Sequence, residues 1–442
     1  MKNSGFFNIK IFCIFLFTAC SAILCGATAD IEKFFSENAA NLWTLNPQQV
    51  NIVLGVPLKA QDEFDNIMRY NIKESKDRII FKDMNVAEVL FYFHKRKLQS
   101  IMISFYNRGD SGNINEKKFQ QIHKQTVSFL TTVLKCKKIS SENIKFDKSV
   151  VQSVKFADNF NDYILLYSNK SKTPEYVQLK IYHKGKSAKL KQNIRAATDI
   201  KSLKKNLQKA NGNLLYLDIP MVNQGRKGYC AAATIERIMK YYGAEVDQQI
   251  IAQIAKSDAE KGTNAEKLFK ALEKNSAKLN VKIEKIMTEK IFNDVDNFKK
   301  FHETYNNFAK KQKLKRIKFK DIVSDKNKKN AVNISMFMKE YFYDVFLAAR
   351  MNDDKTFSQF KHSVRNTIQE GIPLVWISFV LDKDKSGEKI GNAVLHMNII
   401  NGCKGTDTLV FTDSWGKNHS RKIMNMRDAW ARTSMLIKIM PK

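Results

Sequence analysis

One stretch of this sequence, residues 214–243, indicates more about the fold than any other: LLYLDIPMVNQGRKGYCAAATIERIMKYYG. Its first four residues are apolar, as in a buried strand. After a polar loop, apolar residues recur at helical spacing from Ala231 to Tyr242, and Gly243 is the residue type that commonly ends a helix. The pattern therefore predicts a strand, a loop and a helix that begins at Cys230.

A cysteine at the start of a helix has a distinctive chemistry. The unpaired amides and the positive end of the helix dipole favour an anion there, so we expect a lowered pKa for the Cys230 thiol and a larger thiolate fraction. Thiolates attack carbonyl carbons. Gln224 lies six positions earlier, and we expect its side-chain amide, with the Cys230 backbone amide, to donate hydrogen bonds to the developing oxyanion.

Such a nucleophile needs an imidazole partner, and His396 is the best candidate. It lies in the apolar, strand-like segment 394–400. The next expected strand, 409–412, ends at Asp413, so two neighbouring strands would place this carboxylate beside the imidazole and fix its tautomer and orientation. The apolar segment 371–378 is typical of a buried strand, which we expect at the centre of the same sheet.

Simpler interpretations exist for each of these residues. A free cysteine such as Cys230 is more often an inert core residue than a nucleophile, but the spacing of Gln224 and the downstream histidine and aspartate favour catalysis. His362 and His419 are rival bases. Both lie in polar surroundings, and we expect them to be solvated surface groups.

These motifs together resemble cysteine peptidase family 39 and its relatives, which have the papain-like fold. The resemblance spans about residues 214–440. It implies that Gln224 stabilises the oxyanion, Cys230 attacks, His396 transfers the proton and Asp413 orients His396. The matching motifs are the run from Ile219 through Gln224 to Cys230, the helix end Tyr241-Tyr242-Gly243, the strand entry Gly371-x-Pro373, His396, and the turn Asp413-x-Trp415-Gly416.

The chain departs from that family in three places. Ala231 stands where the family often has glycine, and Ser414 replaces the proline that usually follows the aspartate. A long charged segment also precedes Phe357, and no ATP-binding or transmembrane transporter segment is attached. Processing of bacteriocin leader peptides, which the best-known members perform, is therefore not carried over.

The first 29 residues are typical of a secretory signal peptide. Lys2 and Lys10 precede an apolar run from Ile11 to Leu24, and small residues end the segment before Asp30. The run is shorter than the roughly 20 residues that span a bilayer, so we expect cleavage after Ala29, export to the periplasm or the outside of the cell, and no transmembrane segment in the mature chain. Lipoprotein anchoring at Cys20 is the alternative.

The chain of 442 residues is too long for one ordinary domain, so we expect two. In the first, a hairpin at 88–106, a helix at 115–134 and strands at 162–168 and 175–183 indicate an antiparallel sheet that carries one long helix. The overall fold class is then α+β, with a papain-like domain in which an N-terminal catalytic helix packs on an antiparallel sheet. The expected segments are a signal peptide (1–29), a smaller α+β domain of unknown role (30–185), a basic linker (186–213) and the papain-like domain (214–442), with an almost entirely helical insertion at about 264–353.

The charge and the cysteine content limit the other partners. The formal charge is +31, but the lysines are spread along the chain, which favours solvated helix faces over a nucleic-acid site. An anionic envelope surface remains the alternative partner. Outside the signal peptide only Cys136, Cys230 and Cys403 remain, which excludes a fully paired disulfide framework. We expect Cys136 and Cys403 in the core, with a mutual disulfide as the alternative.

Without C-x-x-C spacing or clustered histidines, we expect no metal ion and no cofactor. The sequence therefore predicts an exported, bacterial-type cysteine peptidase that cuts a peptide or protein substrate through a Cys-His-Asp triad and an acyl-enzyme intermediate. Two alternatives remain. One is a papain-fold transamidase or acyltransferase, which would use the same triad, and the other is a catalytically idle envelope-binding module.

Overall fold

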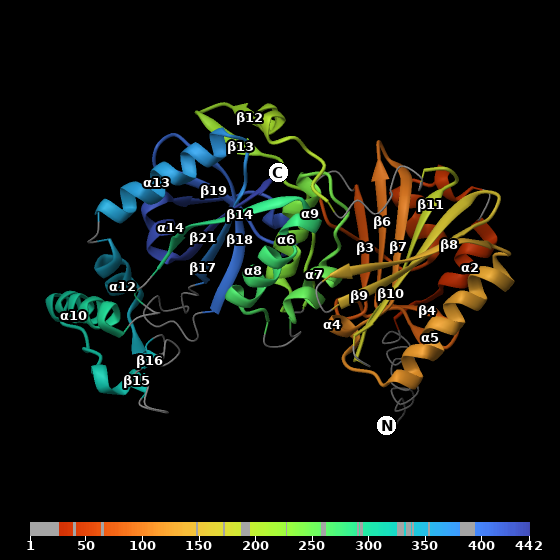
Figure 1. Ribbon diagram of the computed structural model, residues 1–442, viewed down its shortest axis with the longest axis horizontal. Coiled ribbons are helices and arrows are strands. Elements are labelled where there is room, and N and C mark those ends of the chain that lie inside the picture. The colour runs from red at the N-terminus through yellow and green to blue at the C-terminus, as the bar shows by residue number, and fades with distance from the viewer. Residues whose placement is uncertain are drawn as a thin grey trace, which may run out of the picture.

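A computed structural model gives the architecture of the chain (Figure 1). Residues 1–25, with Cys20 and most of the predicted signal peptide, lie outside the described residues, as do residues 187–194 of the expected linker. The structure describes residues 26–442 with the exception of 39–40, 63–65, 147–148, 171–172, 187–194, 227, 258–261, 290, 292–294, 325–330, 333–336, 338–339, 352–353 and 381–393.

The N-terminal half is built on an eight-stranded antiparallel sheet. The predicted hairpin at its centre is confirmed: β6 and β7 pair antiparallel, and the turn places Lys95 and Arg96 in left-handed backbone, as tight hairpin turns require. In sheet order the strands are β2 (Lys59–Ala60), β3 (Ile67–Asn71), β6 (Glu88–His94), β7 (Lys97–Asn107), β11 (Thr173–His183), β10 (Asn161–Lys170), β9 (Ser149–Ala157) and β8 (Lys137–Phe146).

Three helices cover one face of this sheet: α2 (Ile31–Asn38), α3 (Pro47–Leu54) and α5 (Glu116–Ser128) (Figure 1). The predicted long helix is α5, which begins after the cap Asn115 and continues into a π-helical turn at Phe129–Val133. Their apolar side chains and one face of the sheet form a core of their own. A small sheet of β1 (Thr28–Asp30), β4 (Arg78–Phe81) and β5 (Met84–Asn85) and the short helix α4 (Arg108–Ser111) complete this half.

The C-terminal half contains a second antiparallel sheet, in the order β12-β13-β18-β17-β21-β14. The expected central strand is β17, which pairs with β18 on one side and β21 on the other. β19 pairs with β18, as predicted for the strand that precedes Asp413. The strands are β12 (Leu207–Ala210), β13 (Leu214–Leu217), β18 (Val394–Lys404), β17 (Leu374–Val380), β21 (Thr433–Pro441), β14 (Val281–Thr288), β19 (Thr408–Thr412) and β20 (Lys422–Asn425).

Helix α6 (Cys230–Tyr241) begins at the predicted residue and packs on β18. Helices α13 (Asp354–Gln369) and α14 (Met426–Arg432) also pack on this sheet. The remaining elements are α7 (Gln248–Ala255), α8 (Ala265–Lys274), α9 (Ser276–Leu279), α10 (Val295–Lys311), β15 (Val323–Ser324), β16 (Ala331–Val332) and α12 (Tyr343–Arg350).

Two expectations about this half are wrong in detail. The segment 264–353 was expected to be almost entirely helical, but its residues Val281–Thr288 form β14, an edge strand that pairs with β21. Apolar and charged residues alternate at the start of this strand, a pattern typical of a half-exposed strand. The expected linker also contributes to the fold, because Leu207–Ala210 form β12 and pair with β13.

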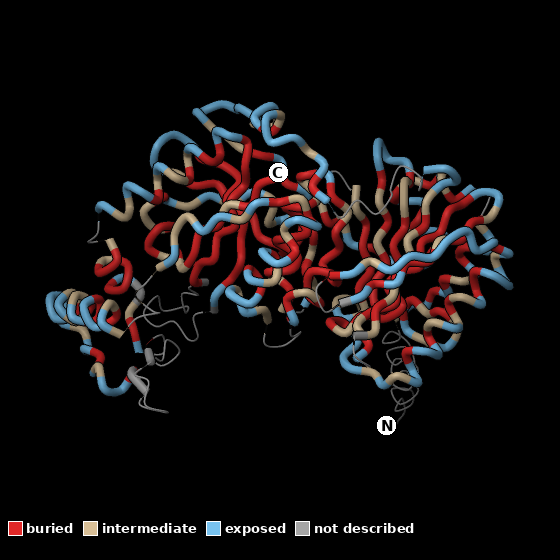
Figure 2. Tube along the Cα trace, viewed as in Figure 1, coloured by how far each residue is buried: buried red, intermediate tan, exposed pale blue. Residues whose placement is uncertain are grey.

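The two halves share a core. Figure 2 shows buried residues in the interior of both lobes and at the place where they meet. Ile164, Leu166 and Tyr176 of the N-terminal sheet are buried in the same apolar cluster as the side chains of α6 and α7. Gln178 donates a hydrogen bond to Asp247 (3.1 Å) across this boundary. The N-terminal sheet therefore lies between its own helices on one face and the C-terminal helices on the other.

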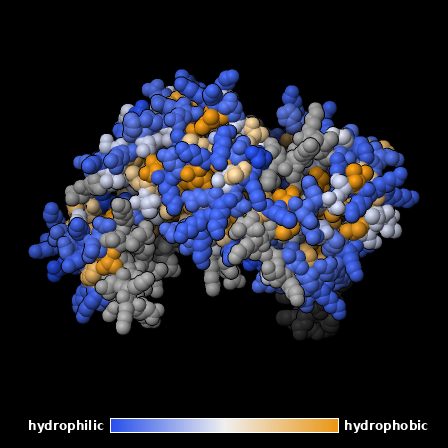
Figure 3. All heavy atoms as spheres, viewed as in Figure 1, coloured by the Kyte–Doolittle hydropathy of each residue, from blue (hydrophilic) through white to orange (hydrophobic). Residues whose placement is uncertain are grey.

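The molecular surface is mostly polar. Figure 3 shows hydrophilic residues over most of the coloured face, with apolar residues scattered among them. Within the described residues, no helix combines the length and the apolar character needed to cross a bilayer.

The shared core yields a prediction about stability. Leu166→Ala should lower the free energy of unfolding by about 3 kcal/mol, because it leaves a cavity in a cluster that both halves share. Urea unfolding followed by tryptophan fluorescence should show one transition, displaced to lower urea. The exposed control Ile52→Ala should change stability by less than about 0.5 kcal/mol. Two separate transitions, only one of them displaced, would show that the halves unfold independently.

Candidate active site

Cys230 is the first residue of α6, and it lies against strand β18. Thr234, one turn further along α6, donates a side-chain hydrogen bond to the Met397 carbonyl (3.1 Å). The Met397 backbone also hydrogen-bonds to the Cys230 thiol. His396 precedes Met397 on the same strand, so the docking of α6 on β18 brings the elements that carry Cys230 and His396 together. Cys230 remains partly exposed.

The expected lowering of the thiol pKa is wrong for this structure. Burial raises the pKa of the Cys230 thiol, although backbone hydrogen bonds from Met397, Ala231 and Cys230 itself lower it in part. The physical reason is that the sulfur loses more hydration than the helix start returns through its amides. The resting thiol is therefore protonated at neutral pH.

His396 is almost fully buried on β18, with 5% of its surface exposed. Burial lowers the pKa of His396 to about 4, and the nearby negative charge of Asp413 offsets only part of this effect. Its ring stacks on the indole of Trp415, with 4.3 Å between ring centroids. The Nε2 atom is buried and has no hydrogen-bond partner among the described residues. The resting imidazole is neutral, so thiol and imidazole form no ion pair.

Asp413 lies at the end of β19 and bonds to other groups. Its carboxylate accepts hydrogen bonds from His419 Nδ1 (2.8 and 2.9 Å to its two oxygens), from Lys422 Nζ (2.7 Å) and from the Trp415 amide (3.1 Å). Burial acts to raise the pKa of Asp413, but the hydrogen bonds from Lys422 and His419 outweigh it, so that the pKa is lowered. His419, expected as a solvated surface group, is instead the residue that pairs with this aspartate.

Gln224 is buried in the loop before α6 and is attached to the turn after Asp413. Its backbone amide donates to the Ser414 carbonyl (2.9 Å), and the Ser414 hydroxyl donates to its Oε1 (2.7 Å). A side-chain amide has a carbonyl end and an NH₂ end. Ser414 binds the carbonyl end of Gln224, whereas a candidate oxyanion donor would use the NH₂ end.

Arg237, a fully buried cation on α6, is a further residue of the site that was not predicted from the sequence. Its guanidinium donates to the backbone carbonyls of Pro220 (2.9 Å) and Asp413 (2.5 Å) and to the Thr412 hydroxyl (2.8 Å). Burial lowers its pKa to about 10, and the charge of Asp413 acts in the opposite direction. Arg237 therefore ties the helix, the loop and the turn together. A signal was present, since an arginine interrupts the apolar face of the helix next to Ile238.

Neither the other two cysteines nor a cleft between the two halves belongs to this group of residues. Cys136 and Cys403 are buried free thiols, as expected for core residues, and no disulfide joins them. Among the described residues, no three His, Cys, Asp or Glu side chains gather in a way that would hold a metal ion. A cleft of about 870 Å³ between the two halves is lined by residues such as Lys180, Glu236 and Lys240, but by none of the four candidate residues.

The raised thiol pKa predicts a pH dependence. In a Cys136→Ser, Cys403→Ser background, iodoacetamide should alkylate Cys230 at a rate that keeps rising above pH 8.5, the ordinary thiol pKa being roughly 8.5. The sign follows from burial, which disfavours the thiolate and delays its formation to higher pH. Mass spectrometry of quenched samples gives the rate. A plateau already reached below pH 7 would instead indicate a preformed thiolate–imidazolium pair.

A second prediction concerns Arg237. Arg237→Ala removes the three hydrogen bonds that the guanidinium donates to Pro220, Asp413 and Thr412, so the free energy of unfolding should fall by about 3 kcal/mol. Urea unfolding measures the change. Arg226→Ala is the matched control, since Arg226 is exposed on the same loop and should contribute less than about 0.5 kcal/mol. Equal stabilities for the two variants would show that Arg237 does not hold the site together.

Comparisons with known proteins identify no relative: no protein family, no curated protein and no solved structure matches this chain. The chain is an α+β protein with large antiparallel sheets, and its chemistry is inferred from the positions and contacts of its own residues.

Proposed function

We propose that the chain is an exported cysteine peptidase with a papain-like C-terminal domain, in which Cys230 attacks a peptide carbonyl. The observation that supports this most strongly is the docking of α6 on β18. It presents a partly exposed thiol at a helix start to the strand that carries a buried imidazole, whose Nε2 has no hydrogen-bond partner among the described residues. A purely structural cysteine needs neither the histidine nor the oriented glutamine amide.

His396 acts as a general base in the proposed reaction, because both groups are neutral at rest. As the sulfur bonds to the carbonyl carbon, the thiol proton passes to the imidazole, and Gln224 with the Cys230 amide stabilises the oxyanion. The imidazolium then returns the proton to the leaving amine, which leaves a thioester. His396 next takes a proton from water, whose oxygen attacks the thioester carbon. The C–S bond then breaks, the sulfur takes the proton back from the imidazolium, and the carboxylic acid product is released.

Asp413 has two roles in this proposal. It holds the turn that carries Trp415, through the hydrogen bond from the Trp415 amide. Its negative charge also favours the imidazolium form of His396, as the direction of its effect on the His396 pKa indicates. Direct orientation of His396 by Asp413 would need the carboxylate to leave His419 or Lys422, the groups that it binds at rest.

The test compares two histidines in one assay. Hydrolysis of p-nitrophenyl acetate and of fluorescein-labelled casein should disappear in Cys230→Ala and fall by about 10³-fold in His396→Ala, the range expected for loss of a general base. His419→Ala is the matched control, since it removes a second imidazole that touches Trp415 and Asp413. It should retain at least about a tenth of the activity.

Two outcomes would contradict the proposal. Hydrolysis that survives in Cys230→Ala would exclude the thiol as the nucleophile. An equal loss in His419→Ala and His396→Ala would mean that the base is not specifically His396. Circular dichroism of each variant shows whether the fold is retained.

A further inference from the structure

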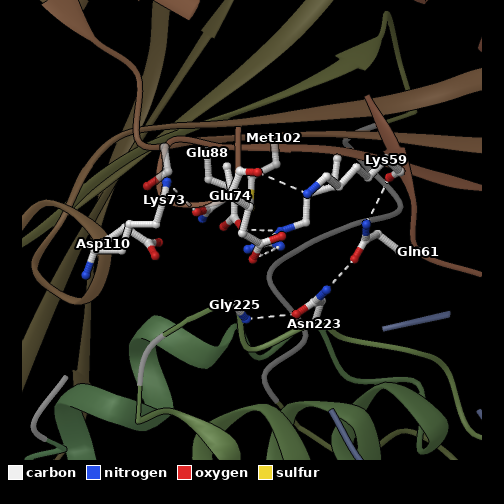
Figure 4. A network of polar contacts seen from close by, with 12 residues as sticks. Lys59, Gln61, Lys73, Glu74, Glu88, Met102, Asp110, Asn223 and Gly225 are labelled. Atoms are coloured by element: carbon white, nitrogen blue, oxygen red, sulfur yellow. Dashed lines mark hydrogen bonds and ion pairs between the residues drawn. The ribbon is translucent and has the colours of Figure 1, made fainter. Parts of the chain in front are cut away.

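The loop that carries Gln224 is held from the N-terminal half of the chain as well as from its own domain. Asn223, the residue before Gln224, donates from its side chain to Gln61 Oε1 (2.7 Å), and Gln61 donates in turn to the Lys59 carbonyl (2.9 Å) (Figure 4). Asn223 Oδ1 accepts from the Gly225 amide (2.8 Å). Gln61 of the N-terminal half therefore binds Asn223, whose side chain also binds Gly225, the residue on the other side of Gln224.

Gly225 adds a second contact between the halves. It has a φ of +72°, and a Cβ atom there would lie 2.9 Å from a guanidinium nitrogen of Arg69. Arg69 is itself fixed, because Glu88 (2.6 Å) and Glu74 (2.7 Å) bind its buried guanidinium. The backbone of the loop thus lies directly on a rigid ion-pair cluster of the N-terminal sheet (Figure 4).

Gln61 also lies beside the turn that follows Asp413. A Cβ atom at Gly416 would lie 2.9 Å from Asn223 Nδ2 and 3.7 Å from Gln61 Oε1. The loop and this turn are the two segments that Ser414 and Gln224 join. Gln61 therefore lies where the loop that carries Gln224 meets the turn that follows Asp413.

We infer that the N-terminal domain completes the candidate active site, with Gln61 as a positioning residue that sets the place of Gln224 through Asn223. The inference rests on the proposed function for its catalytic part. A displacement of about 1 Å in a catalytic group can reduce a rate by about 100-fold, so the loss of the one hydrogen bond between Gln61 and Asn223 should have a large effect on catalysis. The N-terminal domain is then a part of the enzyme, and a delivery or anchoring role is not needed to explain it.

The experiment uses two reagents that differ in their need for an oxyanion hole. p-Nitrophenyl acetate passes through an oxyanion, whereas alkylation by iodoacetamide does not. Gln61→Ala should lower kcat for the ester about 10-fold to 100-fold with KM nearly unchanged, and should leave the alkylation rate of Cys230 within about twofold. Gln61→Glu keeps an oxygen that accepts from Asn223 but loses the donation to the Lys59 carbonyl, so it should restore part of the lost kcat.

Gln253→Ala is the matched control. Gln253 is also a buried glutamine that bonds across the domain boundary, to Ser168 (2.6 Å), but it lies on α7 and not beside the loop. It should leave kcat for the ester unchanged within about threefold. If Gln253→Ala lowers kcat as much as Gln61→Ala does, the effect comes from the interface as a whole and the inference fails.

Hydrogen exchange measures the positioning independently of activity. Peptides covering residues 221–226 should exchange faster in Gln61→Ala than in the wild type, but not in Gln253→Ala. Unchanged exchange in Gln61→Ala would overturn the inference. Failure of the proposed function would give a different result, namely equal ester turnover by the wild type and Cys230→Ala. In that case hydrogen exchange alone would decide whether Gln61 positions the loop.

Discussion

The packing of α6 on β18 at Met397 is the constraint on which the rest of the site depends. The backbone of Met397 hydrogen-bonds to the Cys230 thiol at the helix start and to the Thr234 hydroxyl one turn later. These two bonds fix both the rotation of α6 about its axis and its position along β18. Arg237, on the same helix, extends the constraint to the loop before the cysteine and to the turn after β19. Helix α6, the loop before it, β18 and the turn after β19 are thereby held together.

Burial dominates the electrostatics of this arrangement. It raises the pKa of the thiol and lowers that of the imidazole, so each group is held in its neutral form. An open site would favour a charged pair at rest, whereas in the proposed reaction the buried site would separate charge only when a substrate binds. The negative charge nearby, on Asp413, offsets the burial of His396 only in part, and this carboxylate is hydrogen-bonded to Lys422 and His419.

The sequence predicted the elements that have strong local signals, and it failed where partners come from distant segments. The helix start at Cys230, the hairpin around Lys95 and the central strand β17 follow from apolar periodicity and turn residues. The partners of Asp413 could not be predicted in this way. The carboxylate binds His419 and Lys422 and not His396, and this choice depends on the three-dimensional path of the turn after β19, which sequence spacing does not reveal. The strand β14 was missed because its exposed edge carries charged residues, which suggested a helix. The contact between Gln61 and Asn223 joins residues 162 positions apart, and nothing local indicates it.

Trp415 has a consequence for the imidazolium form of His396 that the proposed reaction requires. Its indole is partly exposed and lies flat on His396, while the ammonium of Lys422 lies 5.7 Å from the ring centroid. The face of an indole attracts cations by its quadrupole, so the ring that covers a neutral imidazole at rest becomes a favourable neighbour once that imidazole gains a proton. Lys422 already occupies part of this electron-rich surface. The indole of Trp415 therefore contacts one permanent cation, the ammonium of Lys422, and in the proposed reaction it would also stabilise the imidazolium of His396.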